Sequence, residues 1–321
     1  MKMRSIYYSL KNFFLLLYSY IYDYKVYKNS KSSKYHIANI ERSILLIVHA
    51  LEKGLSFAHK KKNWGGEKAY ELCRLLDNCY LKYINQDIKS LAVNILSCYK
   101  EDDFSCKEKC LVDNIESIIN RNRNLIDEKY IGVKQINEPP FFNEQQIVSF
   151  FDNRISVRYF SDLKLTDEEI KKAINFAKCT PTACNRQSSK VYVFRQKDKM
   201  KEILDNQMGD QGWCKNASAL IVITGNESYF NGTYERRQVF IDGGLYAMNF
   251  VYGLHLQHIA SCYKMFISEP RREKKFKKLC NIPNNEVPIV LILSGHYNQY
   301  PTYSPLSKKI ETKYEVDGIK M

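Results

Sequence analysis

Two short polar segments in the second half of the chain carry the side chains best suited to binding chemistry. In the segment 153–160, Arg154, Ser156 and Arg158 alternate with apolar residues. In extended backbone, residues two apart point to the same side, so two guanidinium groups and a hydroxyl can converge on one anion. This pattern indicates a site for a phosphate monoester. The alternative is an exposed edge strand with solvated arginines.

The second polar segment, TPTACNRQ at 180–187, follows a predicted helix. The side-chain amides of Asn185 and Gln187 can each donate and accept hydrogen bonds, which suits them to the edge of a heteroaromatic ring. Cys184 lies beside them. A small thiol that packs the loop is favoured over a redox-active one.

Alternating helices and strands must position these segments. Thr166 and Glu169 form the pattern of a capping box at the start of a helix that Pro181 cannot extend. Strands are expected at 190–195, 219–224, 261–266 and 288–293, separated by helices near 198–208, 241–258 and 269–280. This order predicts an α/β or α+β domain with a central sheet. The basic tail SPLSKK then contributes Lys308 and Lys309.

Taken in this order, the segments resemble the nitroreductase family of flavoproteins. The family pattern of Arg-x-Ser-x-Arg, a helix, Pro-Ser-x-x-Asn-x-Gln and a strand is matched by RISVR, PTACNRQ and KVYVF. The match continues with ALIVIT, IDGGLYAMNFVYGLHLQHI and VPIVLILSGHY, and the resemblance covers about residues 145–312. It implies an α+β, nitroreductase-like FMN-binding fold with a central mixed sheet flanked by helices. It also implies an intertwined homodimer with flavin sites at the subunit interface.

The resemblance also assigns roles. The implied cofactor-binding residues are Arg154, Ser156, Arg158, Asn185, Gln187 and Lys308. The first three would hold the FMN phosphate and ribityl chain. The two amides would approach the isoalloxazine, either from the same subunit or from the partner subunit. Lys309 could replace Lys308 near the phosphate. No protein residue is expected to be catalytic, because flavin carries the chemistry.

The implied reaction is a ping-pong hydride transfer from NADH or NADPH through FMN to a small organic acceptor. A nitroaromatic, a quinone and a biosynthetic intermediate all stay open as that acceptor. Ser188 and Ser189 replace a frequent Pro-Trp, and Ile155 replaces a residue that is commonly basic or polar. The alternative function is an FMN-binding protein with a structural or regulatory role, linked to polysaccharide biosynthesis.

The first 140 residues read as helices, with helical patterns over 40–51, 67–83, 87–99 and 106–128. Gly54 is placed as a left-handed cap that ends the first of these helices. Pro139 and Pro140 interrupt the pattern. We therefore expect a helical region over 1–140, the flavin domain over 144–312 and a C-terminal tail over 313–321.

The stretch HALEKGLS at 49–56 resembles an extension found before some nitroreductase-like domains, a group associated with polysaccharide gene clusters. His49, Glu52 and Lys53 fall within about one helical turn. They would cap the flavin cleft or contact a substrate. A helix end with solvated charges is the equal alternative.

An apolar run, FFLLLYSYIY, covers residues 13–22 and follows Lys2, Arg4 and Lys11. No small-residue cleavage site follows it, and about ten residues are too few to cross a bilayer, which needs roughly 20. A core or dimer-contact helix is favoured over an interfacial helix. Peripheral membrane contact through residues 4–27 stays open.

Composition narrows the remaining classes. The 321 residues allow about two domains, and 49 basic against 35 acidic residues give a net charge of +14. Such a charge attracts phosphate, nucleic acid or acidic lipid, although a general compositional bias explains it equally well. The run RREKKFKK at 271–278 reads as a solvated helix face, so no specific nucleic-acid partner is expected.

Cysteine and histidine usage bears on metal binding and location. None of the ten cysteines forms a CxxC pair, and His255 and His258 have no matching ligands, so no metal site is expected and these histidines read as packing or surface residues. A long chain with an even number of cysteines and no convincing export signal favours reduced thiols. The predicted location is therefore the cytoplasm.

Overall fold

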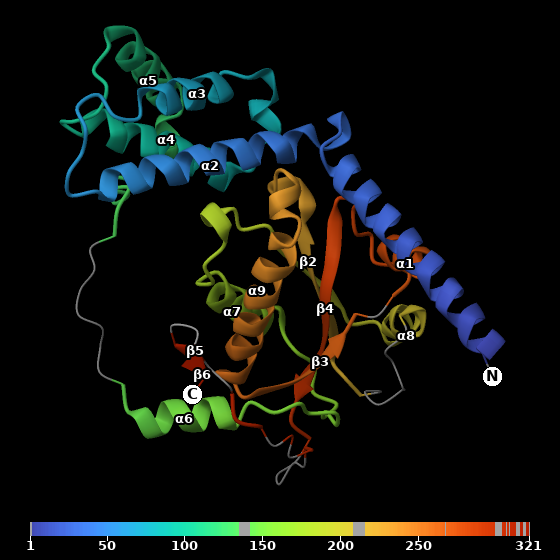
Figure 1. The fold of residues 1–321 in the computed structure, drawn as a ribbon. Helices are drawn as coiled ribbons and strands as arrows, with labels where there is room; N and C mark the ends of the chain where they lie inside the picture. The colour runs from blue at the N-terminus through green and yellow to red at the C-terminus, as the bar shows by residue number, and fades with distance from the viewer. Residues whose placement is uncertain are drawn as a thin grey trace.

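The computed structural model describes residues 2–134, 142–207, 216–266 and 268–298, with stretches of the tail at 304–305, 307, 309–312, 315–316 and 319–320. The expected junction at Pro139 and Pro140, and the tail residue Lys308, lie outside these residues. Within the described part, a cluster of helices lies above an α+β unit, and a long first helix runs along the side of that unit (Figure 1).

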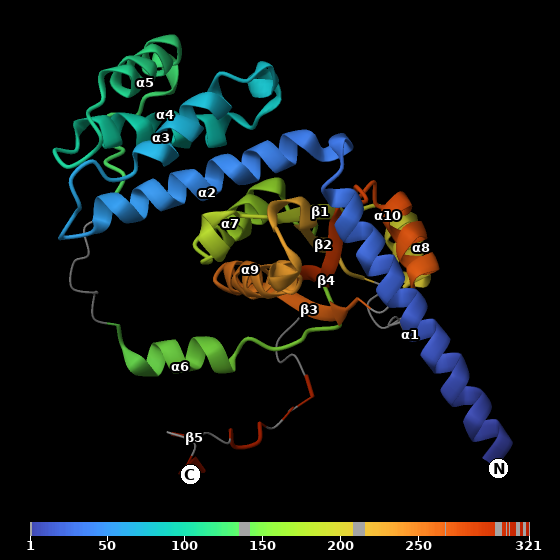
Figure 2. The same cartoon turned by 45° about the horizontal axis from the view of Figure 1, so that its top comes forward.

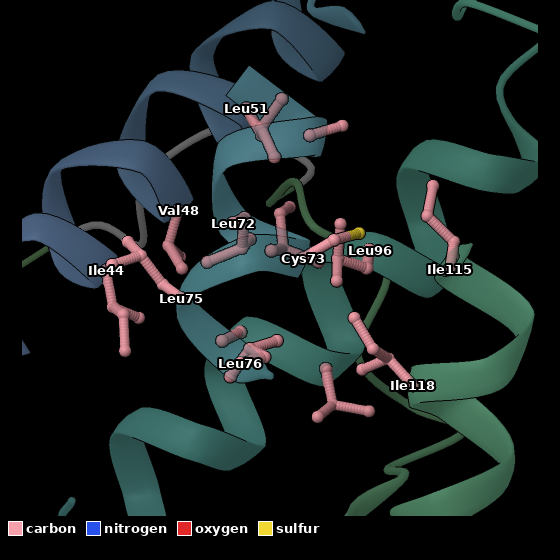
Figure 3. Packing of buried hydrophobic residues seen from close by; sticks show 14 of the residues in the cluster. Ile44, Val48, Leu51, Leu72, Cys73, Leu75, Leu76, Leu96, Ile115 and Ile118 are labelled. Atoms are coloured by element: carbon pink, nitrogen blue, oxygen red, sulfur yellow. The ribbon is translucent and has the colours of Figure 1, made fainter. Parts of the chain in front are cut away.

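The helical cluster is built from four helices around one apolar core. They are α2 (His36–Ser56), α3 (Gly66–Leu76), α4 (Gln86–Glu101) and α5 (Lys109–Arg121). Short helical turns accompany them at η1 (Ser33–Tyr35), η2 (Cys79–Tyr83) and η3 (Arg123–Leu125). Ile44, Leu72, Leu96 and Ile115 meet in the core (Figure 3), each at most 1% exposed. The region is therefore a small helical bundle with its own core.

One of its expected helices is shorter than its pattern. The helix expected over 67–83 ends at Leu76, and Cys79–Tyr83 forms a separate turn. Asn78 adopts extended backbone there, and its side-chain oxygen accepts a hydrogen bond from Tyr80 N at 3.0 Å. This local cap restarts the chain after Leu76, because asparagine competes with helix continuation.

Gly54 does not end its helix. It lies inside α2, so the left-handed cap expected there is wrong. A Cβ on Gly54 would lie 2.0 Å from Cζ3 of Trp64. The Trp64 indole donates to Asp102 Oδ2 at 2.8 Å and meets the Tyr99 ring edge-on at 5.0 Å. The absent side chain therefore makes room for the tryptophan.

Gly54→Ala should destabilise the protein by about 1–3 kcal/mol, since the added methyl overlaps the Trp64 ring in a packed site. Chemical denaturation followed by circular dichroism measures the change. In a Trp64→Ala background the same substitution should be neutral or stabilising, because alanine favours helix by up to about 1 kcal/mol over glycine. An equal loss in both backgrounds would contradict the role of the ring.

The first helix, α1 (Lys2–Ser30), is much longer than its apolar run. Tyr22, Val26 and Ser30 are buried where α1 packs against α10 (Pro270–Leu279) and η5 (Glu227–Tyr229) of the α+β unit. Residues 10–18 are exposed, and α1 projects past its neighbours (Figure 2). A core helix is therefore wrong for these residues, whereas a dimer-contact helix stays a prediction. Within the described residues, no helix is long and apolar enough to cross a membrane.

The α+β unit contains a four-stranded sheet with the order β1-β2-β4-β3. Its strands are β1 (Ser189–Phe194), β2 (Ala219–Asn226), β3 (Ile259–Met265) and β4 (Glu286–His296). All four expected strands are confirmed, with bounds that differ by a few residues. A separate pair joins β5 (Glu315–Val316) to β6 (Ile319–Lys320).

The pairing of the strands differs from the expected mixed sheet. Every strand pair in the described residues is antiparallel. Parallel character beside this sheet is confined to a single bridge between Ser156 and Ser261. Neighbouring strands of this sheet therefore run in opposite directions, and Ser156 adds a bridge rather than a strand.

Helices cover both faces of the sheet, because alternate strand residues point to opposite sides. On one face, α7 (Asp167–Ala177) and α9 (Gln238–His255) pack over Ile221 and Ile223. On the other, α8 (Lys197–Asn206) and α10 pack over Leu220 and Val222. The capping box that begins α7 is confirmed. The remaining helix, α6 (Glu144–Asp152), precedes the first polar segment (Figure 1).

Candidate cofactor-binding site

The segment with two arginines runs from the end of α6 to the edge of β3. Val157 N donates to Ser261 O at 2.9 Å, and Ile155 and Val157 pack onto the apolar core under the sheet. Arg154, Ser156 and Arg158 alternate with them and are half-buried. The alternation expected from the sequence is therefore present, and we call residues 154–158 the arginine segment.

The arginine segment is electropositive. Among the described residues, neither Arg154 nor Arg158 has a carboxylate within salt-bridge distance, and Arg158 Nη1 donates to the backbone oxygen of Ser156 at 3.2 Å. Burial lowers the pKa of His255, and the nearby charge of Arg154 lowers it further. A neutral imidazole with two uncompensated guanidinium groups leaves this place short of negative charge.

His255 also has a packing role, as expected. It lies 3.0 Å through Nε2 from the Phe150 carbonyl oxygen and therefore ties the end of α9 to α6. An open cleft of about 1000 Å³ lies between these helices, with Asn153, Ile155 and Tyr297 in its lining. The cleft adjoins the arginine segment. Within the described chain, no three His, Cys, Asp or Glu side chains are grouped to hold a metal.

The segment with the two amides forms a strained loop that contains η4 (Ala183–Asn185). Asn185 and Gln187 are exposed. Cys184, Asn185 and Gln187 have φ values of 51°, 51° and 49°. This left-handed region is uncommon for residues with side chains and persists only where surrounding contacts enforce it. We call residues 180–187 the amide loop.

Two contacts with α9 fasten the amide loop. Asn249 Nδ2 donates to Thr180 Oγ1 at 2.7 Å, and Ala183 N donates to Asp242 Oδ2 at 3.0 Å. The second oxygen of Asp242 accepts from Gln238 Nε2 at 2.7 Å. Asp242 is 1% exposed, so its carboxylate holds the loop from inside the fold.

Arg186 is the strongest anchor of the amide loop, and sequence reasoning missed it. The residue is 1% exposed and donates to both oxygens of Glu235, at 2.9 and 3.0 Å. It also donates to Tyr229 O at 3.0 Å and lies 4.7 Å from the Phe230 ring centroid. The only sequence signal was its place between two amides, since its partner lies 49 residues further on.

The helical region supports the same anchor from above. Tyr229 donates its hydroxyl to Glu41 at 2.7 Å, and Arg42 Nη1 donates to Ser228 O at 3.3 Å. Ser228 Oγ in turn donates to Ser30 O at 2.9 Å. Through these bonds α2 is joined to η5, and α2 also packs against η4 (Figure 1). The helical region therefore positions the amide loop.

The remaining predicted site residues differ in their surroundings. Glu52 accepts from the Tyr130 hydroxyl at 2.7 Å and lies 3.7 Å from His49 Nδ1, so it holds the helical region together. Lys53 is exposed, as is Lys309. Lys308 lies outside the described residues, so its predicted contact with the phosphate stays a prediction.

The arginine segment and the amide loop lie at opposite ends of α9. Asp242 holds the loop near the start of this helix, and His255 lies beside the arginine segment at its end. These two positions are 13 residues apart, or about 20 Å along the axis at 1.5 Å per residue. Within this chain, the contacts that hold the two segments therefore lie on different parts of α9, and Thr180 of the loop contacts Asn249 between them.

Comparison with known proteins places both segments in one family pattern. Residues 152–211, which contain them, match the model described as nitroreductase family. The chain is 24% identical over 152 residues to a protein of Archaeoglobus fulgidus named "Putative NADH dehydrogenase/NAD(P)H nitroreductase". That match covers 47% of this chain and 86% of the relative.

The chain is also similar to solved structures over about half of its length. A nitroreductase-like protein of Streptococcus mutans has a TM-score of 0.45 and 20% identity, covering 51% of this chain and 95% of that one. An FMN-dependent nitroreductase of Clostridium difficile has a TM-score of 0.42 and 18% identity, covering 49% and 91%. Residues 152–211 therefore match the nitroreductase family, and the chain is similar to a curated nitroreductase relative over about half of its length.

Proposed function

We propose that this protein is an FMN-dependent oxidoreductase that uses NADH or NADPH to reduce a small organic acceptor. The observation that carries this proposal is the arginine segment, where two half-buried guanidinium groups flank a hydroxyl and have no carboxylate partner among the described residues. A flavin phosphate supplies the missing negative charge. Each charge-assisted hydrogen bond to it contributes about 1.5–3 kcal/mol.

FMN, when bound, supplies the hydride chemistry, and the protein binds and orients it. Arg154, Ser156 and Arg158 would hold the phosphate and ribityl end. Asn185 and Gln187 would face the ring system, where their amides both donate and accept. Contacts with α9 fasten the amide loop, so little backbone ordering is left to occur on binding.

The separation of the two segments supports a homodimer with shared sites. The first half of α9 exposes Phe240, Ile241 and Leu245, each by about half of its surface. A second copy that covers this face would remove those side chains from water and bring its own amide loop toward the arginine segment. In such a dimer, each FMN contacts Arg154 of one subunit and Asn185 of the other.

Mixed dimers test this arrangement. Arg154→Ala and Asn185→Ala subunits, co-expressed with different tags and purified for both, should regain one intact site per dimer, because one subunit supplies the wild-type arginine and the other the wild-type amide. FMN content would rise toward one per mixed dimer, while each single-variant dimer stays depleted. A mixed dimer as depleted as its parents would show that both residues serve the same subunit's site.

The first measurement is the visible spectrum of the purified protein. We expect released cofactor to be FMN, and the bound flavin to bleach under anaerobic NADH or NADPH and recover with an acceptor. Bound FMN that neither nicotinamide bleaches would favour the alternative of a structural or regulatory flavoprotein. A colourless protein that FMN does not reconstitute would overturn the proposal.

We place the protein in a reducing compartment, the cytoplasm. Cys73, Cys106 and Cys280 are buried free thiols. Burial raises the pKa of the Cys73 and Cys280 thiols to about 12, which keeps both protonated and unreactive at neutral pH. Such cysteines act as small apolar core residues and require no oxidising environment.

A further inference from the structure

Between Leu10 and Tyr24, α1 carries an apolar stripe whose side chains stay largely exposed in the described chain. Seven large side chains recur at the spacing of one helix face and are each at least 43% exposed: Leu10, Phe13, Phe14, Leu17, Tyr20, Ile21 and Tyr24. At 3.6 residues per turn, the buried Tyr22, Val26 and Ser30 lie on the opposite side. Most of these side chains therefore face away from the α+β unit, whereas Tyr20 and Tyr24 also line an open hollow beside Phe240 of that unit. We call these seven residues the α1 stripe.

The exposed apolar surface also wraps around the helix. Leu15, Leu16 and Tyr18 flank the α1 stripe and are 44%, 54% and 39% exposed. Between residues 13 and 18, every side chain is apolar or aromatic and none is buried. A second protein helix would cover one face of such a segment. An apolar medium, in contrast, can take up the stripe and its flanks together.

The basic residues near this apolar surface indicate which apolar medium it would enter. Lys2, Arg4 and Lys11 lie in the first part of α1, and no acidic residue precedes Asp23. α10, which packs against α1, adds exposed basic side chains at Arg271, Arg272, Lys274, Lys275 and Lys278. Basic residues beside an apolar helix attract anionic lipid headgroups. The same charges would repel each other if two copies of α1 paired in parallel.

The attachment of α1 makes its orientation definite. The Tyr22 hydroxyl donates to Glu273 at 3.1 Å, and Lys277 Nζ lies 2.9 Å from the same carboxylate. Lys277 is 2% exposed in its side chain, so this contact is internal. The contact between α1 and α10 leaves the α1 stripe exposed over about 21 Å from Leu10 to Tyr24, at 1.5 Å per residue. The helix itself extends past its neighbours (Figure 2).

We propose that α1 is an interfacial helix that seats this protein on a lipid bilayer containing anionic lipids. The α1 stripe enters the boundary between headgroups and acyl chains, its tyrosines lie at headgroup level, and the lysines contact lipid phosphates. The packing of α10 against α1 then holds the nitroreductase-like domain beside the membrane surface. This inference rests on α1 and α10 and does not depend on bound FMN.

Vesicle sedimentation of the full chain tests the proposal. Phosphatidylcholine vesicles with about one third phosphatidylglycerol should bind the wild type, and pure phosphatidylcholine should bind it less. Phe13→Gln with Leu17→Gln should weaken partitioning at least about tenfold, because two large apolar groups leave the membrane contact. Both side chains are exposed, so thermal unfolding of the variant should match the wild type.

The matched control removes the same residue types elsewhere. Phe57 and Leu163 are 61% and 66% exposed outside α1, and Phe57→Gln with Leu163→Gln should leave vesicle binding unchanged. Equal losses in both double variants would overturn the proposal, as would a wild type that binds neither vesicle. Light scattering without lipid separates the remaining case. A smaller oligomer for the α1 variant, with vesicle binding as in the wild type, would assign the stripe to contact between copies.

Discussion

Arg154→Ala is expected to weaken FMN binding by about 10- to 150-fold. The arginine is half-buried and, among the described residues, has no carboxylate to keep it occupied, so its guanidinium is available to a phosphate. Removing one charge-assisted contact of about 1.5–3 kcal/mol changes the dissociation constant by that factor. Fluorescence titration of the apoprotein with FMN measures the constant directly.

A second arginine serves as the control for charge. Arg123 is exposed and donates to Asn120 in the helical region, far along the chain from the arginine segment. Arg123→Ala removes the same unit of net charge and should leave the FMN dissociation constant within about twofold, because exposed charges at a distance are screened by salt. Unchanged FMN affinity in Arg154→Ala would refute the assignment of the phosphate site.

Much of the α+β unit could be predicted because its signals are local. The capping box at Thr166 and Glu169 needs only four residues, and a short apolar run between polar turns predicts each strand. The arginine segment follows the same logic, since alternation alone puts Arg154 and Arg158 on one side. Such features depend only on residues that are close together in the sequence, so the sequence alone is enough to predict them.

The parts that escaped prediction depend on distant partners. Gly54 resembled a helix end because the sequence does not show that Trp64 fills the space beside it. The apolar run of α1 resembled a core helix, since hydropathy does not tell whether anything covers it. In the sequence, Arg186 looks like an ordinary polar loop residue, because its ion-pair partner Glu235 lies 49 residues further on. Tertiary pairing decides such roles, and propensity does not encode it.

Arg186→Ala should destabilise the protein by about 3 kcal/mol, the largest effect on stability that we expect. Breaking a buried ion pair costs about 3–5 kcal/mol, because the remaining charge and acceptors lose their partner. Glu235 keeps 23% of its side-chain surface exposed, which favours the lower end. The amide loop would also lose its direction, so FMN affinity should fall with stability. Chemical denaturation at pH 7 measures the first effect.

An exposed pair gives the matched comparison. Arg74 donates through Nε and Nη2 to both oxygens of Glu71, at 2.9 and 2.7 Å, so this pair is bidentate as well, but the two side chains are 73% and 43% exposed. Arg74→Ala should cost no more than about 0.5 kcal/mol, because solvent competes for both groups. Similar losses for Arg74→Ala and Arg186→Ala would show that burial does not set the strength of the inner pair.

Acidification should remove part of the contribution of the inner pair. Burial opposes ionisation of Glu235, but hydrogen bonds from Arg186 and Asn231 N outweigh it and hold the pKa of Glu235 below its ordinary value. A carboxylate with a lowered folded-state pKa stabilises the fold above the ordinary glutamate pKa, about 4.3, and loses that contribution as pH falls through the folded value. The stability difference between wild type and Glu235→Gln should therefore shrink below about pH 4. A difference that stays constant from pH 7 to that range would show that the ionised pair contributes nothing.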